Sequence, residues 1–381
     1  MRVLVVSNAG HGHLFPLIPI VRRLIAAGHE AVIAVPSEFV ATVQGLGLPA
    51  RGIAAQSRSE AEREQQRRYL EQLPQPQRSA EGIGAFVASG EAGLAELDAL
   101  CAELAPNVIL REQMAHGGWL LGERRQLPVV VFDSLPLPGE AWATLAGGRF
   151  EEARAKAGLA LESSARSLAG ALTLLSGPRA WFDYVAPNAM LFRPSDAIAP
   201  PEAAPAWLSA LPEPLVYATL GAALGREPAR WRALLAGLAR VDASVVATIG
   251  PELELTSLGA IPPNVRALRF VPQQFVLERC DAALSHGGYG SLMGALARGV
   301  PQVALPSGAA DEAQNAARLV RLGAGIALAP DERAPEHIAA ALRRVLREPG
   351  PRWAAQRVAR EIEALPPIDE VVGWIEAMAA P

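Results

Sequence analysis

Short runs of apolar residues alternate along this chain with longer segments in which apolar residues recur every three or four positions. The short runs are typical of strands in a parallel sheet whose two faces are both covered. The spaced segments are typical of helices that bury one face. This alternation predicts an α/β protein. The predicted strands are Arg2 to Ser7, Glu30 to Val35, Asn107 to Leu110, Pro128 to Phe132, Ala171 to Leu175, Leu215 to Leu220, Ser244 to Ile249, a run ending at Ser285, Gln302 to Leu305 and Ile326 to Leu328.

Two segments interrupt the alternation and indicate how the chain divides. Residues 54–78 are rich in Arg, Glu and Gln and contain Pro74-Gln75-Pro76, which predicts a mobile, solvated segment. Residues 193–214 are dense in Pro and Ala, a composition typical of a semi-rigid linker. The expected division is a first domain over residues 1–196, a linker over 197–214, a second domain over 215–358 and a final helix over 359–381.

Composition and charge narrow the class of protein. With 381 residues, half of them hydrophobic, the chain is long enough for two domains with separate cores. Its formal net charge of -4 predicts no basic surface for nucleic acid. No apolar run reaches the roughly 18 residues of a membrane span, and the first residues fit a strand better than a signal peptide. Cys101 and Cys280 stand in apolar contexts, which predicts buried free thiols and a cytoplasmic protein.

A glycine-rich turn follows the strand that ends at Ser285. It reads His286-Gly287-Gly288-Tyr289-Gly290-Ser291, and a helix from Leu292 to Arg298 is predicted after it. Glycines let backbone N–H groups approach a ligand, Ser291 can cap the helix, and a helix start carries partial positive charge. These features suit a phosphate, and Asp311 and Glu312 beyond the next strand offer acceptors for sugar hydroxyls. The alternative is a strand-to-helix turn without a ligand.

A second candidate site lies at the start of the chain. His13 stands between the first strand and a helix predicted to begin near Pro16, where open α/β sheets build their sites. A histidine there can act as a general base, and the alternative is an ordinary loop residue. Glu112 follows a later strand, and a carboxylate behind the imidazole would fix its tautomer. The alternative for Glu112 is a surface ion pair with Arg111.

These motifs resemble the family 1 glycosyltransferases of the GT-B fold, especially bacterial enzymes that decorate polyketide and enediyne natural products. His13 falls in the family's GH-x-x-P pattern as the general base, and Glu112 stands where many members have Asp. The resemblance implies nucleotide binding by Phe270, Val271, Gln273, His286, Gly287, Gly288, Gly290, Ser291 and Gly221. It implies donor-sugar contacts from Asp311 and Glu312, which belong to a segment matching the family's DQ-x-x-NA motif.

The resemblance also implies a fold and an acceptor region. The fold would be two Rossmann-like βαβ domains facing a central cleft, with the acceptor on the first, the nucleotide sugar on the second, and the C-terminal helix crossing back to the first domain. Phe86, Trp142 and Phe150 are the candidates for an apolar acceptor pocket. The alternative for these aromatic side chains is packing in the core.

The expected function is an inverting glycosyltransferase that moves a deoxysugar from a dTDP-sugar to a hydroxyl of a hydrophobic secondary metabolite. It would use no metal, because the chain contains no Asp-x-Asp motif, and no cofactor besides the nucleotide sugar. Its partners would be this donor and a small aglycone. The protein itself would be a monomer or a homodimer. A sugar-nucleotide epimerase of the same fold and a non-catalytic nucleotide-sugar-binding partner are the alternatives.

The choice of dTDP depends on Gly294, in the helix after the glycine-rich turn. Relatives that use UDP-sugars commonly have Glu there, whose carboxylate accepts hydrogen bonds from the ribose hydroxyls. Glycine offers no such acceptor, and a deoxyribose requires less. The alternative is that Gly294 only allows a helix and a strand to pack closely.

Overall fold

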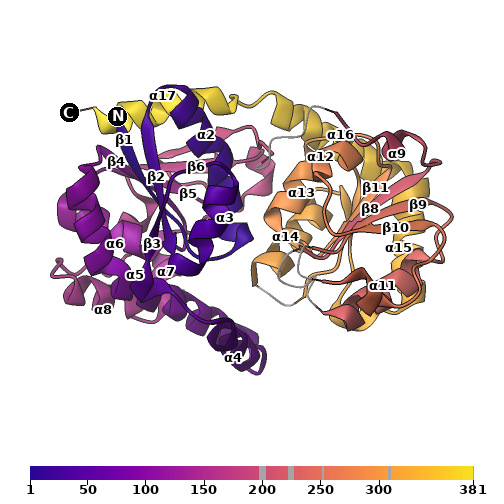
Figure 1. Ribbon diagram of the computed structural model, residues 1–381, viewed down its shortest axis with the longest axis horizontal. Coiled ribbons are helices and arrows are strands. Elements are labelled where there is room, and N and C mark those ends of the chain that lie inside the picture. Colours follow the sequence, from indigo (N-terminus) through magenta and orange to yellow (C-terminus); the bar gives the residue numbers. More distant parts are fainter. Residues whose placement is uncertain (197–202, 222–226, 251–252, 308–309, 381) are drawn as a thin grey trace. The chain divides into compact units, whose positions relative to one another are not determined.

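The chain folds as two α/β units, each built on its own parallel sheet (Figure 1). This computed structural model describes residues 1–196, 203–221, 227–250, 253–307 and 310–380. Unit 1 comprises Met1–Phe192 together with Pro366–Pro381, and unit 2 comprises Arg193–Leu365. The predicted pair of parallel-sheet, Rossmann-like domains is therefore confirmed.

The sheet of unit 1 has, within the described residues, seven parallel strands in the order β3-β2-β1-β4-β5-β6-β7. Valine, isoleucine and leucine fill most of these positions because both faces are covered by helices. The order reverses between β1 and β4, whose ends pair in register at Val6 and Arg111. The strands are β1 (Arg2–Val6), β2 (Glu30–Pro36), β3 (Ala50–Ile53), β4 (Val108–Glu112), β5 (Val129–Phe132), β6 (Leu172–Ser176) and β7 (Ala189–Phe192).

Helices cover this sheet and bury its core. Leu97 and Trp119, from two of the helices, pack with the strand residues Leu4 and Ile109. The described helices of unit 1 are α1 (His11–Leu14), α2 (Ile18–Ala26), α3 (Val40–Gly45), α4 (Glu60–Glu71), α5 (Gln75–Leu104), α6 (His116–Arg125), α7 (Gly139–Ala146), α8 (Arg149–Lys156) and α17 (Ile368–Ala379), with 3-10 turns η1 (Phe15–Leu17), η2 (Ser37–Phe39), η3 (Ala54–Gln56), η4 (Arg166–Ala169) and η5 (Arg179–Trp181).

The C-terminal helix α17 returns to unit 1, as expected. It lies beside α2 in Figure 1, and its buried residues Val371 and Ile375 form its inner face. Arg23 pairs with Asp369 at 3.3 Å, and the Nε2 of His29 lies 2.8 Å from the carboxylate of Glu376. The helix therefore belongs to unit 1 although all of unit 2 precedes it in the chain.

The sheet of unit 2 has six parallel strands within the described residues, in the order β10-β9-β8-β11-β12-β13. The order reverses between β8 and β11, whose last residues, Thr219 and Ser285, are paired. The strands are β8 (Leu215–Thr219), β9 (Ser244–Thr248), β10 (Val265–Leu268), β11 (Ala282–Ser285), β12 (Gln302–Ala304) and β13 (Gly325–Ala327). The described helices of unit 2 are α9 (Ala206–Ser209), α11 (Pro228–Leu238), α12 (Gln273–Leu277), α13 (Tyr289–Leu296), α14 (Ala310–Arg321), α15 (Pro335–Arg347) and α16 (Pro349–Glu363), with turns η6 (Leu255–Leu258) and η7 (Pro330–Glu332).

The segment predicted to be mobile and solvated contains a helix that the sequence reasoning did not predict. Residues 60–71 form α4, which Figure 1 shows extending away from the sheet of unit 1. Ser59 and Glu62 cap its start reciprocally, and Glu64 pairs with Arg68 at 2.7 Å along its surface. Local hydrogen bonds and ion pairs, rather than a buried apolar face, stabilise this helix. Its sequence therefore shows no helical apolar periodicity from which the helix could be predicted.

Two expected boundaries differ from those in the structure. Residues 197–202 of the predicted linker lie outside the described residues, but α9 follows, and its Leu208 is buried in the core of unit 2. This part of the predicted spacer is therefore packed. Residues 359–363, predicted to belong to the returning helix, complete α16 in unit 2, and the return to unit 1 begins at Pro366. The proline pair before α17 marks this break in the helix.

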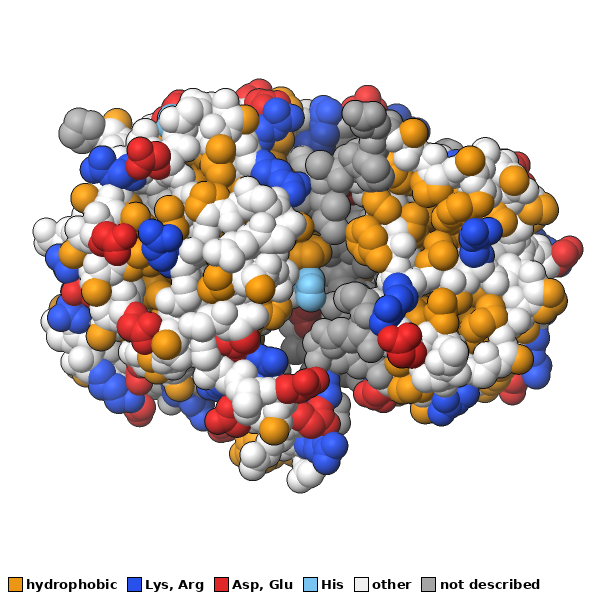
Figure 2. Space-filling model, in the orientation of Figure 1, with side chains coloured by type: hydrophobic (Ala, Val, Ile, Leu, Met, Phe, Trp, Pro, Cys, Tyr) orange, Lys and Arg blue, Asp and Glu red, His pale blue; other side chains and the backbone are white. Residues whose placement is uncertain are grey.

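The surface and the thiols agree with the composition. Figure 2 shows acidic and basic side chains interspersed on the viewed face of each unit, as 35 basic and 39 acidic residues would suggest. Cys101 and Cys280 are both free and buried. Among the described residues, no helix has the length and hydropathy needed to cross a membrane.

Candidate active site

The predicted base and its carboxylate meet at the carboxyl edge of the unit 1 sheet, where the strand order reverses. His13 lies in the first turn after β1, and Glu112 is the last residue of β4. Because β1 and β4 are neighbours, the two side chains converge, with 3.3 Å between Nδ1 of His13 and Oε2 of Glu112. Open α/β sheets bind ligands at such a point.

Glu112 is buried, and three groups stabilise its ionised form. Its Oε1 accepts a hydrogen bond from Nδ2 of Asn8 at 2.7 Å, and its Oε2 accepts one from the backbone N–H of Met114 at 2.7 Å. Burial opposes the charge, but the charge and hydrogen bond of His13, with the donors of Met114 and Asn8, outweigh it and lower the pKa of Glu112 to about 2. The carboxylate is therefore ionised at neutral pH.

The alternative of a surface ion pair between Arg111 and Glu112 is wrong. Both side chains are buried, and the guanidinium of Arg111 donates to the backbone oxygens of Gln113 at 2.7 Å and Glu112 at 3.2 Å. Arg111 therefore fixes the main chain at the end of β4, while the carboxylate of Glu112 turns toward His13.

Of the three aromatic residues predicted to line an acceptor pocket, only Phe86 contacts the dyad. Its ring lies edge-on to that of His13, with 5.1 Å between the ring centroids. Trp142 and Phe150 are buried in the core of unit 1, and Phe150 packs against His116 and Trp119. Trp142 and Phe150 therefore fit the alternative of packing in the core. They belong to α7 and α8, which both contact α5.

The glycine-rich turn lies at the corresponding edge of unit 2. Gly221 follows β8 and His286 follows β11, and these strands are neighbours where the strand order reverses. Gly221 has a φ of +69°, and a Cβ there would lie 2.5 Å from Cε1 of His286. A Cβ at Gly288 would lie 2.4 Å from Nε2 of the same ring. The imidazole therefore lies between two glycines, and a side chain at either position would have to displace it.

His286 is neutral at physiological pH. Burial lowers its pKa to about 4, although the negative charge of Asp311 opposes this effect. Its Nδ1 is buried without a hydrogen-bond partner among the described residues. A neutral imidazole donates one hydrogen bond, so His286 offers an anion a dipole rather than a full charge.

Ser291 does not cap the helix, contrary to the prediction. α13 begins at Tyr289, two residues earlier than Ser291, and Gly288 is its N-cap residue, with no side-chain cap. α13 therefore starts within the motif itself. The backbone N–H groups of Gly290 and Ser291 therefore belong to the first turn, which needs partners outside the helix.

The acidic pair at the start of α14 divides into one exposed and one buried carboxyl. Asp311 is exposed, whereas Oε2 of Glu312 accepts hydrogen bonds from the N–H and the hydroxyl of Ser307, both at 2.6 Å. Burial, together with the charge of Asp311, raises the pKa of Glu312 to about 7 although Ser307 opposes the shift. Asn315 donates to the carbonyl of Gly287 at 3.2 Å and ties α14 to the turn.

The segment predicted to bind the nucleobase leads into α12, which begins at Gln273. Phe270 is 57% exposed and so presents its ring to solvent, whereas the side chain of Val271 is buried in the core. A Cβ at Gly294 would lie 2.9 Å from Nε2 of Gln273. Gly294 thus allows two helices, α12 and α13, to pack closely, rather than a helix and a strand as the alternative expected, and the amide of Gln273 occupies the room beside it.

Asn8 is a site residue that the sequence reasoning missed. It stood within a predicted loop, and only the pairing of β1 with β4 brings it to Glu112. The available signal was a polar residue directly after a buried strand, two positions beyond Val6. No cluster of His, Cys, Asp and Glu suited to a metal ion occurs in the part of the chain that the structure describes.

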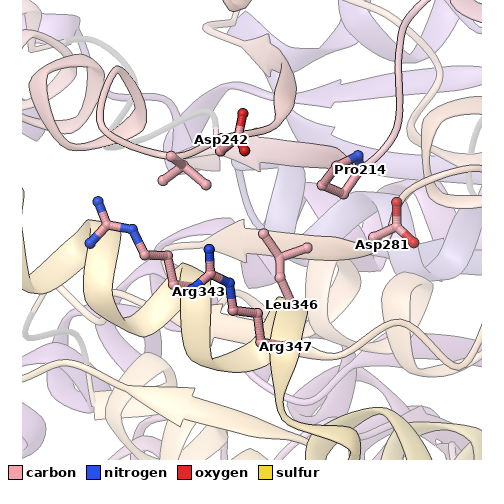
Figure 3. A pocket seen from close by; sticks show the side chains of 7 residues that line it. Pro214, Asp242, Asp281, Arg343, Leu346 and Arg347 are labelled. Atoms are coloured by element: carbon pink, nitrogen blue, oxygen red, sulfur yellow. The ribbon is translucent and has the colours of Figure 1, made fainter.

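A cavity of about 230 Å³ lies at the opposite, amino edge of the unit 2 sheet (Figure 3). It precedes β8, β9 and β11 and is smaller than the roughly 300 Å³ at which ligand sites usually begin. Asp281 in its wall accepts a hydrogen bond from the backbone N–H of Leu215 at 2.9 Å and so serves the fold. This cavity is separate from the glycine-rich turn and adds no group to it.

The chain is similar to known proteins along its whole length. The family model described as erythromycin biosynthesis protein CIII-like, C-terminal domain, matches residues 232–378. The L-demethylnoviosyl transferase of Streptomyces niveus is 32% identical over 399 residues, covering 100% of this chain and 98% of that protein. Glycosyltransferase VinC in complex with dTDP has a TM-score of 0.78 at 25% identity, covering 100% and 99%. Spinosyn rhamnosyltransferase SpnG complexed with thymidine diphosphate has a TM-score of 0.78 at 27% identity, covering 99% and 100%.

Proposed function

This chain belongs to the bacterial antibiotic glycosyltransferases of the GT-B fold, and we propose that it transfers a deoxysugar from a dTDP-sugar to a hydroxyl of a hydrophobic secondary metabolite. The acceptor would be a polyketide, with enediynes among the candidates. The single observation that carries the proposal is the pairing of His13 with the buried, ionised Glu112.

The proposed chemistry follows from which nitrogen of His13 faces Glu112, namely Nδ1. With Nδ1–H of His13 donating to Glu112, the lone pair of Nε2 accepts the proton of the acceptor hydroxyl. The freed oxygen attacks C1 of the donor sugar as the bond from C1 to the diphosphate breaks. A single displacement inverts the configuration at C1. Glu112 stabilises the imidazolium that forms, because its charge is fixed beforehand.

The leaving diphosphate needs groups that do not depend on a metal ion. We assign this role to His286 and to the N–H groups of Gly287 and Gly288, which precede α13, and of Gly290 and Ser291 in its first turn. Gly221 lies against the imidazole of His286. We assign Asp311 to contacts with the donor sugar. A donor hydrogen bond at the leaving oxygens strengthens as their charge grows, which favours the transition state over the bound substrate. Chelators are therefore expected to leave the rate unchanged.

Thymidine diphosphate is the proposed donor nucleotide for two reasons. VinC and SpnG were solved with dTDP and thymidine diphosphate. In this chain Gly294 presents no carboxylate to a ribose hydroxyl, and Gln273 fills the adjacent room. A 2′-hydroxyl left unpaired would weaken UDP binding by roughly 5- to 150-fold relative to dTDP. Calorimetric titration of both nucleotides checks this, and equal affinity or tighter UDP binding contradicts it.

The proposed function is tested by presenting the purified protein with dTDP-deoxysugars and a panel of hydrophobic hydroxylated aglycones. We expect release of dTDP only when an acceptor is present, and an inverted anomeric centre in the product by NMR. His13→Ala should reduce transfer by about 10²- to 10⁴-fold and leave dTDP affinity unchanged, because the general base is lost and the nucleotide sites lie in unit 2. Full activity in this variant, or release of nucleotide without an acceptor, contradicts the assignment.

A further inference from the structure

Asn8 lies two residues beyond β1 and reaches across to the end of β4. Its side chain is buried, its Nδ2 donates to Oε1 of Glu112 at 2.7 Å, and its backbone N–H points to the same oxygen at 3.4 Å. The other oxygen, Oε2, receives the N–H of Met114 and lies 3.3 Å from Nδ1 of His13. Each carboxylate oxygen therefore has its own partners: Asn8 holds one, and Met114 and His13 share the other.

Glutamate at this position needs this second support. Its side chain has one rotatable bond more than that of aspartate, so more contacts are required to keep one orientation. A buried carboxylate oxygen without a short hydrogen bond loses solvation that nothing replaces. Without the side-chain amide of Asn8, Oε1 would keep only the 3.4 Å contact with the backbone N–H of residue 8. The carboxylate would then rotate to recover a closer donor, and Oε2 would no longer stay directed at His13.

The orientation of Glu112 decides which nitrogen of His13 carries the proton. While Oε2 faces Nδ1, the tautomer with hydrogen on Nδ1 is favoured, and Nε2 keeps the lone pair that a general base needs. We infer that Asn8 is a positioning residue, which acts through Glu112 to hold His13 in its basic tautomer. This inference rests on the proposed function and adds to it a residue that contacts neither substrate nor the reacting atoms.

The first experiment compares Asn8→Ala with Asn188→Ala. Asn188 is a matched control, since its side-chain amide also bonds within unit 1, to the carbonyls of Ala169 and Gly170. We expect Asn8→Ala to lower kcat by about 5- to 150-fold, the rate equivalent of losing the short hydrogen bond to a buried acceptor, with the KM for the nucleotide sugar unchanged. Asn188→Ala should retain wild-type kcat. An unchanged kcat in Asn8→Ala overturns the inference.

A double-mutant cycle separates positioning from a general structural role. In a Glu112→Ala background the carboxylate is gone, so removing Asn8 as well should cause no further loss of kcat. If the same fold loss appears in both backgrounds, Asn8 acts on the structure and not through Glu112. Asn8→Asp gives a second variant of nearly unchanged shape. Its introduced carboxyl can donate to Glu112 only when protonated, so its activity should fall as pH rises, unlike that of the wild type.

A spectroscopic measurement on the unliganded protein decides the matter without turnover. In ¹⁵N NMR of protein labelled at histidine, the wild-type signal of His13 should show the Nδ1–H tautomer, and Asn8→Ala should shift it toward a mixture, while Asn188→Ala should not. An unchanged tautomer in a folded Asn8→Ala protein contradicts the inference. If the wild type transfers no sugar to any acceptor yet the tautomer shifts, the proposed function fails and the positioning role of Asn8 remains.

Discussion

At the scale of the residue, the sites depend on close contacts whose partners the sequence only partly reveals. A motif predicted His13, His286 and Glu112 because each stands at a fixed spacing from glycine or from a strand end. The reach of Glu112 to His13 could not be predicted, since it depends on how β1 and β4 pair. Asn8 was missed for the same reason: no local pattern connects it with a residue 104 positions away.

The two glycines around His286 give a prediction about the diphosphate site. A methyl group at Gly288 would lie 2.4 Å from the imidazole, so Gly288→Ala should displace the ring. We expect this variant to weaken dTDP binding and to slow transfer as much as His286→Ala does, by about 10-fold or more. Gly350→Ala is the control, because a Cβ at Gly350 meets nothing within 4 Å. Calorimetry with dTDP measures the effect, and wild-type affinity in Gly288→Ala would mean that the ring tolerates displacement.

Glu312 gives a prediction about pH and stability. Its pKa is raised to about 7, whereas an unfolded glutamate ionises near 4.5. Between these values the folded protein holds a proton that the unfolded chain has lost, so the free energy of unfolding decreases as pH rises and levels off above pH 7. Glu312→Gln should match the wild type at low pH and exceed its stability above pH 7 by up to about 3 kcal/mol.

Urea denaturation at a series of pH values measures this slope. Glu361→Gln, at an exposed position on α16, is the control and should keep the wild-type pH dependence. Parallel stability curves for the wild type and Glu312→Gln would show that the carboxyl of Glu312 is not held protonated by its burial beside Ser307.

At the scale of the element, the sequence predicted the strands and helices that bury apolar residues. It did not predict elements with few apolar residues or elements stabilised mainly by polar contacts. The long apolar strands were predicted because both of their faces are covered. β3 and β10 were missed because polar residues or glycine interrupt their apolar positions, and β7 was missed because it is a four-residue strand directly before the segment rich in Pro and Ala. α4 was missed because a capping box and ion pairs maintain it in solvent.

The packing of α5 on α6 gives a prediction at this scale. A Cβ at Gly90 would lie 2.5 Å from the backbone nitrogen of Gly117, so the two helices approach at a point where only glycine fits. Gly90→Ala should force the helices apart and lower the free energy of unfolding by roughly 1–3 kcal/mol. Gly82→Ala, in the same helix but with nothing within 4 Å of its Cβ, should raise it by up to about 1 kcal/mol. Equal effects of the two substitutions in chemical denaturation would refute this account of the helix contact.

At the scale of the whole molecule, two similar sheets perform different tasks because different loops follow their strands. Both sheets reverse their strand order next to the first strand of the unit, and both place a histidine there. One histidine has a carboxylate partner and is assigned proton transfer, and the other stands between glycines and is assigned anion binding. The architecture shared by the two units could be predicted from the alternation of strands and helices. The different roles of the two histidines could be predicted only from the motifs around them.

The returning helix α17 gives a prediction for the molecule as a whole. Ile375 is fully buried, so Ile375→Ala should destabilise unit 1 by about 2–5 kcal/mol although the residue lies beyond unit 2 in the sequence. Hydrogen exchange should increase in α2 and β4, which α17 contacts, and remain unchanged in the strands of unit 2. Gly373→Ala is the control, because a Cβ there meets nothing within 4 Å and alanine favours the helix. Faster exchange confined to unit 2 would contradict the assignment of α17 to unit 1.

The assembly of unit 1 from two separate stretches of chain sets the order in which the protein can be completed during synthesis. Unit 2 is continuous, so its described strands and helices are all translated before α17. Until α17 has left the ribosome, the surface of α2 that it covers stays bare on the nascent chain, and chaperones that recognise apolar segments can bind there. The first domain to begin is thus the last to be completed.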